Sequence, residues 1–219
     1  MADSGFEDYS NMVNSLYAGC PVVIKMFLKS AADKFLVDAS REGNIDRVRR
    51  MLKEGATNYN AAMSHAAYNG YIDIVKLLQN LATSHNEAIC QAAQRGHIDI
   101  VTLISDNRER VNCNWAMAYA ASNGHIDIVK LMLERGADNY NGAAKWALDA
   151  DHLDIVRLLL DKGADCNMVL IAGAKKGSID IVKIALEKGA YNYNEVINAI
   201  SNTDIKKLLE PYTEKTKIS

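Results

Sequence analysis

Three histidines recur at one position of a repeated phrase and are the first residues to suggest chemistry. His97, His125 and His152 each precede an apolar run with an Asp in it, as in HIDIV and HLDIV. A structural zinc ion needs about four Cys, His or carboxylate ligands around one point. Equivalent side chains on neighbouring packed helices lie about 8–10 Å apart, so these histidines cannot readily share one ion. No cysteine or carboxylate completes a ligand set, and we therefore expect no metal site.

The positions of the recurring acidic residues and the absence of known catalytic motifs also argue against a catalytic site. An Asp follows the first apolar residue of each run, where a carboxylate at a helix start favours the helix dipole; these are Asp73, Asp99, Asp127, Asp154 and Asp180. They are not placed as a pair of acids for catalysis. No GxSxG, P-loop, HExxH or GxGxxG motif occurs. The sequence predicts no enzymatic activity and no cofactor.

Composition narrows the class of protein and its partners. The chain is 49% hydrophobic and 24% charged, with a formal net charge of −2, which gives no reason to expect a nucleic-acid or membrane partner. No apolar run approaches the roughly 18 residues of a membrane span, and the acidic start is unlike a secretory signal. The cysteines, with no CxxC pairing, are Cys20, Cys90, Cys113 and Cys166. We expect a reducing, intracellular and cytoplasmic location.

The histidines and acids belong to a repeat that covers nearly the whole chain. Its anchor is the residue before the apolar run, found at Gly43, Gly70, Gly96, Gly124, Asp151 and Gly177 in steps of 27, 26, 28, 27 and 26 residues. A weaker copy, SNTDIKKLL, begins at Ser201, and another, AGCPVVIKMFL, begins at Ala18. About eight units with no linker between them are therefore expected.

Each unit has the pattern of two short helices. In the segment 114–124, Met117, Ala120 and Ala121 share one helical face, and Val129 lies on the core side of the helix that follows. Helices of about ten residues are unstable alone and must be buried on neighbouring units. We expect an N-cap at the start of each first helix; the residues are Asn60, Asn86, Asn114, Asn141, Asn167 and Asn194, with Asp33 earlier. The pattern predicts an all-α solenoid of stacked helix-turn-helix repeats.

The repeated phrase resembles the ankyrin repeat. The two alanines of the first helix are followed by Gly124 and His125, then by DIVKL, and then by Gly136, Ala137 and Asp138. In that family the His belongs to the inter-repeat hydrogen-bond pattern. Two departures are the period of about 27 residues against the usual 33 and the missing TPLH. We therefore expect tight joints without β-hairpin fingers, similar to the shortened repeats of large DNA viruses of amoebae.

The ends of the array have the features of caps. We expect one array over residues 1–219, with an N-terminal capping repeat at 9–32, central repeats at 33–194, a C-terminal capping repeat at 195–210 and a tail at 211–219. Lys206 replaces the Val of the repeat, which makes sense only where no further repeat stacks. Pro211 should end the last helix. A basic cluster, RVRRMLKEG at residues 47–55, is expected to be a solvated helix face.

The outward face of the first helices is the candidate binding surface, and in ankyrin repeats the equivalent residues line the concave groove. At about 100° per residue, Trp115 and Tyr119 point away from the alanine face, and Trp146 holds the matching position in the next repeat. Trp and Tyr are enriched in interface hot spots. The predicted partner-binding residues are Trp115, Tyr119, Trp146, His65, Tyr68, Gln91, Arg95, Asn123 and Asp149. An alternative is that both tryptophans only pack between neighbouring helices.

The resemblance implies a non-catalytic protein–protein interaction module with a protein partner of unknown identity. A second possibility is a structural or self-assembling scaffold component, such as one of a virus. A third is an adaptor that recruits a bound protein to a ubiquitin ligase. We expect a monomer, with self-association left open, and the host cytoplasm as the location if the protein is viral.

Overall fold

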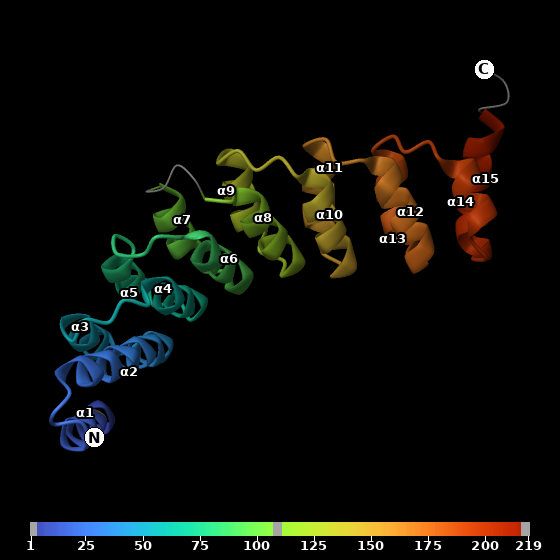
Figure 1. Ribbon diagram of the computed structural model, residues 1–219. Coiled ribbons are helices and arrows are strands. Elements are labelled where there is room, and N and C mark those ends of the chain that lie inside the picture. Colours follow the sequence, from blue (N-terminus) through green and yellow to red (C-terminus); the bar gives the residue numbers. More distant parts are fainter. Residues whose placement is uncertain (1–3, 107–110, 216–219) are drawn as a thin grey trace. The chain divides into compact units, whose positions relative to one another are not determined.

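The computed structural model describes residues 4–106 and 111–215 (Figure 1). The chain consists of two compact units. Unit 1 comprises Met1–Asn112 and unit 2 comprises Cys113–Ser219. Within the described residues every regular element is a helix and none is a strand. The expected all-α architecture with joints free of β structure is therefore confirmed for these residues.

Unit 1 consists of a long N-terminal hairpin followed by shorter ones. Its helices are α1 (Ser4–Leu16), α2 (Pro21–Glu42), α3 (Ile45–Lys53), α4 (Tyr59–Tyr68), α5 (Ile72–Leu78), α6 (Asn86–Arg95) and α7 (Ile98–Asp106). The first helices α2, α4 and α6 pack side by side, and the second helices α3, α5 and α7 form a parallel row behind them. Each helix therefore contacts its hairpin partner and its neighbours in the row, which is the packing of a solenoid.

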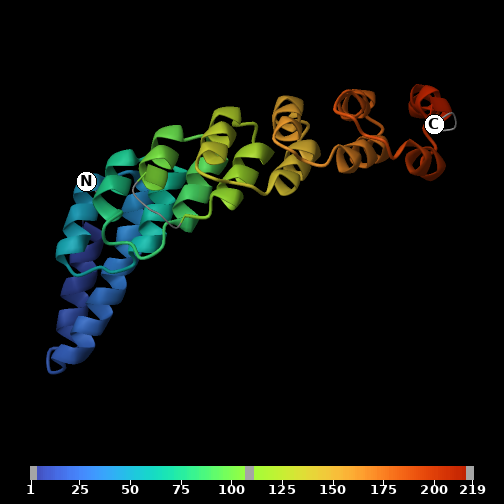
Figure 2. The same cartoon turned by 90° about the horizontal axis from the view of Figure 1, so that it is seen from above.

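Unit 2 repeats the same arrangement. Its helices are α8 (Cys113–Ser122), α9 (Ile126–Glu134), α10 (Tyr140–Asp149), α11 (Leu153–Asp161), α12 (Cys166–Lys176), α13 (Ile179–Glu187), α14 (Tyr193–Ala199) and α15 (Thr203–Lys215). The first helices α8, α10, α12 and α14 form one row, and the second helices α9, α11, α13 and α15 form another (Figure 2). Met117, Ala120 and Ala121 are fully buried between these rows, as is Val129. The alanines allow the helices to approach closely, as the sequence predicts.

Glycine is required at the end of the first helix for two reasons. Gly70 has a φ of 81°, a left-handed conformation that other residues adopt only with strain. A Cβ atom built there would also lie 2.8 Å from the ring of His97 in the next hairpin. Gly124 is packed in the same way under His152, at 2.7 Å. The repeat therefore retains Gly where a neighbouring ring covers the backbone.

The recurring Asn has a different role from the N-cap that the sequence pattern suggests. Asn114 is the second residue of α8, and its Oδ1 accepts hydrogen bonds from the backbone N–H groups of Asp138 (2.9 Å) and Asn139 (3.0 Å) in the next joint. The same bond to the next joint is made by Asp33, Asn60, Asn86, Asn141 and Asn167. The N-cap assignment is therefore wrong: the side chain satisfies backbone donors of the next joint, not of its own helix.

The N-terminal boundary also differs from the prediction. α2 is a single helix of 22 residues that continues through Asp33, so the expected division between 9–32 and 33–194 falls inside it. The reason is local: residues 22–42 contain no Gly or Pro, and no joint phrase interrupts them. α2 packs on α1, α3 and α4; Phe35 in its second half contacts Phe6 of α1, and Phe27 in its first half stacks on Tyr17 of the turn.

The last helix is longer than expected. α15 continues through Pro211 to Lys215, so the prediction that the chain leaves the helix at this proline is wrong. Tyr212 packs on Tyr193 of α14, with ring centroids 5.6 Å apart, and the Thr213 hydroxyl donates to the carbonyl of Glu210. These contacts offset the intrahelical hydrogen bond that proline cannot make.

Candidate functional site

The recurring histidines lie between successive hairpins. His97 Nε2 donates to the Tyr68 carbonyl oxygen at 3.1 Å, across 29 residues of sequence. His152 precedes α11 with its ring over Gly124, and His125 holds the same N-cap position before α9. Among the residues that the structure describes, no group of three His, Cys, Asp or Glu side chains could hold a metal ion. The geometry at His97 is that of an inter-repeat hydrogen bond.

Two half-buried cysteines, Cys90 and Cys113, are poor nucleophiles. Burial, with a smaller contribution from the charge of Glu87, raises the pKa of the Cys90 thiol to about 12. Burial also raises the pKa of Cys113 above its ordinary value. Both groups are therefore protonated thiols at neutral pH, whereas the thiolate is the reactive form.

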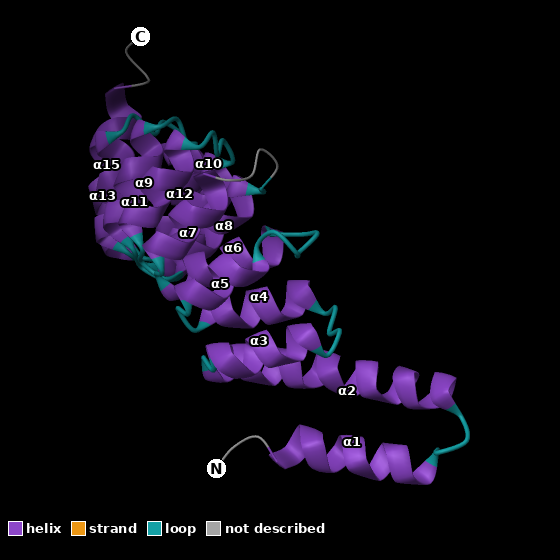
Figure 3. Ribbon diagram, turned by 90° about the vertical axis from the view of Figure 1, so that its left-hand side faces the viewer, coloured by secondary structure: helices purple, strands orange, loops and turns teal. Residues whose placement is uncertain are grey.

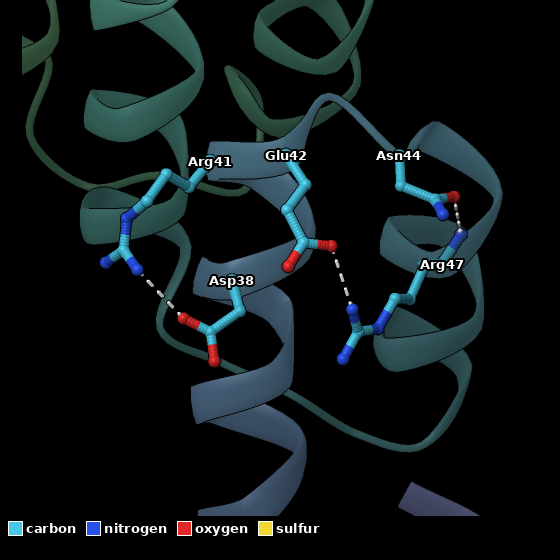
Figure 4. Close-up of polar contacts among 5 residues, drawn as sticks. All are labelled: Asp38, Arg41, Glu42, Asn44 and Arg47. Atoms are coloured by element: carbon cyan, nitrogen blue, oxygen red, sulfur yellow. Dashed lines mark hydrogen bonds and ion pairs between the residues drawn. The ribbon is translucent and has the colours of Figure 1, made fainter. Parts of the chain in front are cut away.

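The basic cluster of α3 is divided: Arg49 and Lys53 are exposed, as a solvated face requires, whereas Arg47 and Arg50 contact the neighbouring helices. Arg47 is mostly buried; it lies over the ring of Phe35, 5.1 Å from the centroid, and donates to Glu42 at 2.9 Å (Figure 4). Arg50 binds Glu7 of α1 at 2.7 Å. Carboxylates of α1 and α2 form ion pairs with Arg50 and Arg47, so these two arginines join the first three helices.

The unit 1 members of the predicted surface lie on α4 and α6. Arg95 lies over the ring of Tyr68, 4.8 Å from its centroid, and Gln91 donates to Glu87 at 2.6 Å. Burial and then the charge of Arg41 lower the pKa of His65, against the raising effect of Asp38 and Glu87. Tyr68 and Arg95 therefore form one pair across neighbouring first helices, on a surface that also carries charged side chains.

Asp38 and Arg41 continue this polar surface onto α2. The two side chains form an ion pair of 3.1 Å one turn apart (Figure 4). The outward face of the first helices in unit 1 is therefore rich in charge that is already paired. Pairs of this kind at the surface contribute little to stability but set which charges a partner meets.

The unit 2 members include a contiguous aromatic cluster. The ring of Tyr119 lies between Trp115, at 6.5 Å, and Trp146, at 5.9 Å, measured between centroids. Trp115 is 54% exposed and Trp146 is 42% exposed, whereas Tyr119 is half-buried. We name these three residues the aromatic patch. They come from adjacent first helices, α8 and α10, whose buried alanines fix the opposite faces.

The two polar residues predicted beside the aromatic patch differ in availability. Asn123 is exposed, but its Nδ2 donates to the Tyr119 carbonyl at 2.9 Å and closes the end of α8. Asp149 is exposed at the end of α10, where Lys176 donates to the neighbouring Leu148 carbonyl. Sequence reasoning did not single out Lys145, which is exposed next to Trp146. Only its place beside an outward tryptophan could have drawn attention to it.

Comparison with known families identifies the repeat. A model described as ankyrin repeats (3 copies) matches residues 36–115 and 89–169, which together span more than half of the chain. A comparison with curated proteins finds no match. No helix in the described part of the chain is long and apolar enough to cross a membrane. The helical hairpins, the inter-repeat His bond and the matched repeats agree, and the chain belongs to the ankyrin-repeat family.

Proposed function

We propose that the chain is a non-catalytic module that binds a protein partner through the outward face of its first helices, with the aromatic patch as the anchor in unit 2. Ankyrin repeats are generally protein–protein interaction modules and are typically non-catalytic. A small number of aromatic side chains commonly dominates the binding energy of such surfaces.

The exposure of the two indoles is the observation that carries this proposal. Core residues of α8 and α10 such as Ala120 and Ala144 are fully buried, yet Trp115 and Trp146 keep about half of their surface in water. Leaving so much apolar area exposed lowers the gain from folding, and a partner that covers it recovers that gain. This supports a binding role over the alternative that the tryptophans only fill space between helices.

The remaining predicted residues contribute to the proposed function according to their unit. In unit 1 the Tyr68–Arg95 pair presents a guanidinium group stacked on an aromatic ring to a partner, with His65 and Gln91 beside it. In unit 2 Asp149 flanks the aromatic patch and Asn123 mainly supports Tyr119. We assign anchoring to the rings and orientation to the charges, because rim charges act chiefly on specificity and association rate.

The proposal is tested with the double variant Trp115→Ala/Trp146→Ala. We expect it to lose the proteins that the native chain captures from its own cell extract, since aromatic anchors each contribute about 2 kcal/mol or more. Its melting temperature should stay close to that of the native chain, because both rings are half in water. The matched control is Tyr191→Ala, a change at an exposed aromatic of unit 2 outside the patch, which should retain capture.

Two further results decide the interpretation. The chain contains two tryptophans, both in the patch, so a captured partner should shift the intrinsic tryptophan emission to shorter wavelength. If the melting temperature of the double variant collapses, the rings are packing residues and the anchor is lost. If the native chain instead assembles into a defined oligomer by light scattering and captures nothing, the scaffold alternative replaces this proposal.

We further propose an intracellular location and an origin similar to that of the shortened repeats of large DNA viruses of amoebae. The four free cysteines and the repeat steps of 26–28 residues support this view.

A further inference from the structure

An uninterrupted apolar segment forms the turn between α1 and α2. Residues 16–24 read LYAGCPVVI and carry no charged side chain. Leu16 is 67% exposed, Val22 is 82% exposed and Met26, one turn further along α2, is 64% exposed. We name residues 16–26 the hairpin tip. Large aliphatic side chains are rarely this exposed together without a surface that covers them.

The charges around the hairpin tip have one sign. No Asp or Glu occurs between residues 9 and 32, whereas Lys25 and Lys29 are both exposed and one turn apart on α2. The first acidic residues on either side are Asp8 and Asp33. The hairpin tip is therefore locally cationic in a chain whose net charge is −2, and it suits an anionic surface.

The fold presents this tip away from the other hairpins of its unit. α2 has 22 residues, whereas α4 and α6 have 10 each, and the α1–α2 turn extends past them both in the view from above and in the view from the side (Figures 2 and 3). The base is held firmly: Phe6 packs on Phe35 with centroids 5.6 Å apart. Nearer the tip, Tyr17 stacks on Phe27 at 5.3 Å. Ring contacts between the two helices thus support a projecting apolar end.

We propose that the hairpin tip binds the surface of an anionic lipid bilayer. Leu16, Val22 and Met26 enter the boundary between headgroups and acyl chains, as the apolar face of an interfacial helix does. Lys25 and Lys29 meet the lipid phosphates, where each basic residue near the surface adds to binding. The binding is peripheral and requires no membrane-spanning helix. It departs from the expectation of no membrane partner, which rests on average charge and on long apolar runs.

Charge decides against a second copy of the chain as the occupant. Pairing two identical tips would bring four lysines together with no carboxylate of the tip to compensate them, and like charges in an interface are costly. A projecting end also offers little area to another projecting end, whereas a bilayer accepts it from all sides.

The experiment uses the full chain and vesicles of phosphatidylcholine with or without phosphatidylserine. We expect the native chain to float with the vesicles that contain phosphatidylserine, and to do so less in high salt, which screens the lysines. The double variant Leu16→Ser/Val22→Ser should lower the partition coefficient at least about tenfold, because it removes two aliphatic side chains from the lipid. Lys25→Gln/Lys29→Gln should reduce binding to the level seen without phosphatidylserine and remove the salt dependence.

A matched control and a local probe make the test specific. Tyr191→Ser removes an equally exposed side chain of unit 2 and should leave vesicle binding unchanged. Cys20 is the exposed cysteine among four, so a polarity-sensitive fluorophore attached there should shift to shorter wavelength on anionic vesicles. Failure of the native chain to bind vesicles overturns the proposal, as does equal binding by the Leu16/Val22 variant. A dimer that this variant converts to monomer, without vesicle binding, would assign the tip to a second copy instead.

Discussion

The interior hairpins of unit 2 and the end helices of the two units are built from similar residues but are covered differently. Met117 of α8 is fully buried between neighbouring helices, whereas Met26 of α2 is mostly in water. Val129 of α9 is fully buried, whereas Lys206 holds the matching place in α15 and is half-buried. The role of a residue in this chain is therefore set by whether another hairpin stacks on it, and not by its type alone.

This difference explains where the sequence follows the repeat closely and where it departs from it. In the interior each side chain has a partner in the hairpin before and after it, so size and polarity are constrained from both sides. Among the described residues no hairpin stacks outside α1 or α15, and it is in these end hairpins that a lysine, a proline and an apolar tip interrupt the repeat. Three pairs of substitutions, one interior and one terminal in each, would break or sharpen this comparison.

The largest contrast is expected between Val129 and Lys206. Val129→Lys places an unpaired charge in a site with no exposed surface and should destabilise unit 2 by roughly 3–5 kcal/mol. Lys206→Gln should change stability by less than about 0.5 kcal/mol, as is usual for accessible sites. Urea unfolding followed by circular dichroism measures both, and equal responses would contradict the assignment of α15 as an end helix.

The next contrast concerns the Asn that bridges to the following joint. Asn114→Ala removes two hydrogen bonds to backbone N–H groups and should cost about 1–2 kcal/mol. Asn194 holds the matching place in α14, but no later joint exists among the described residues, so Asn194→Ala should be nearly neutral. The midpoints of urea unfolding of the two variants measure both costs. A cost at Asn194 as large as at Asn114 would mean that the side chain acts within its own helix after all.

The smallest contrast has the opposite sign. Ser40 of α2 is fully buried and, within the described structure, its hydroxyl has no hydrogen-bond partner. The matching interior residue, Ala121, is also fully buried. Ser40→Ala should stabilise unit 1 by about 1 kcal/mol, and Ala121→Ser should destabilise unit 2 by a similar amount. Thermal melts of the two variants provide the measurement, and a Ser40→Ala variant that melts earlier would show that the hydroxyl is satisfied.

The regular part of the fold could be predicted from the repeated text, and so could the neighbourhood of the aromatic patch. The two-helix unit, its buried alanines and the outward position of Trp115 and Trp146 all follow from helical periodicity. The irregular parts could not be predicted. Asp33 looked like a helix start because its place in the repeat matches that of the Asn residues, yet no turn residue separates it from the preceding helix.

The arginines of α3 and the hairpin tip are two further features that could not be predicted from the sequence. In the sequence, Arg47 and Arg50 form a basic cluster, and nothing local indicates that Glu42 and Glu7 will neutralise them. The apolar segment AGCPVVIKMFL aligns with the repeat and predicts part of a capping repeat, with no sign that its side chains are exposed. Its exposure follows from the tertiary structure, in which α2 is continuous and longer than its neighbours.

The sequence by itself determined the elements that depend on near neighbours along the chain: the helices, the glycine ends and the stacking faces that recur in every unit. Periodicity encodes these because a helix brings residues three and four apart onto one face. The tertiary structure alone decided which recurring polar groups reach the next hairpin, as Asn114 and His97 do, and which apolar residues remain uncovered, as Leu16 and Val22 do. Both outcomes depend on what lies some 25 residues away or beyond the end of the stack, and no local pattern contains that information.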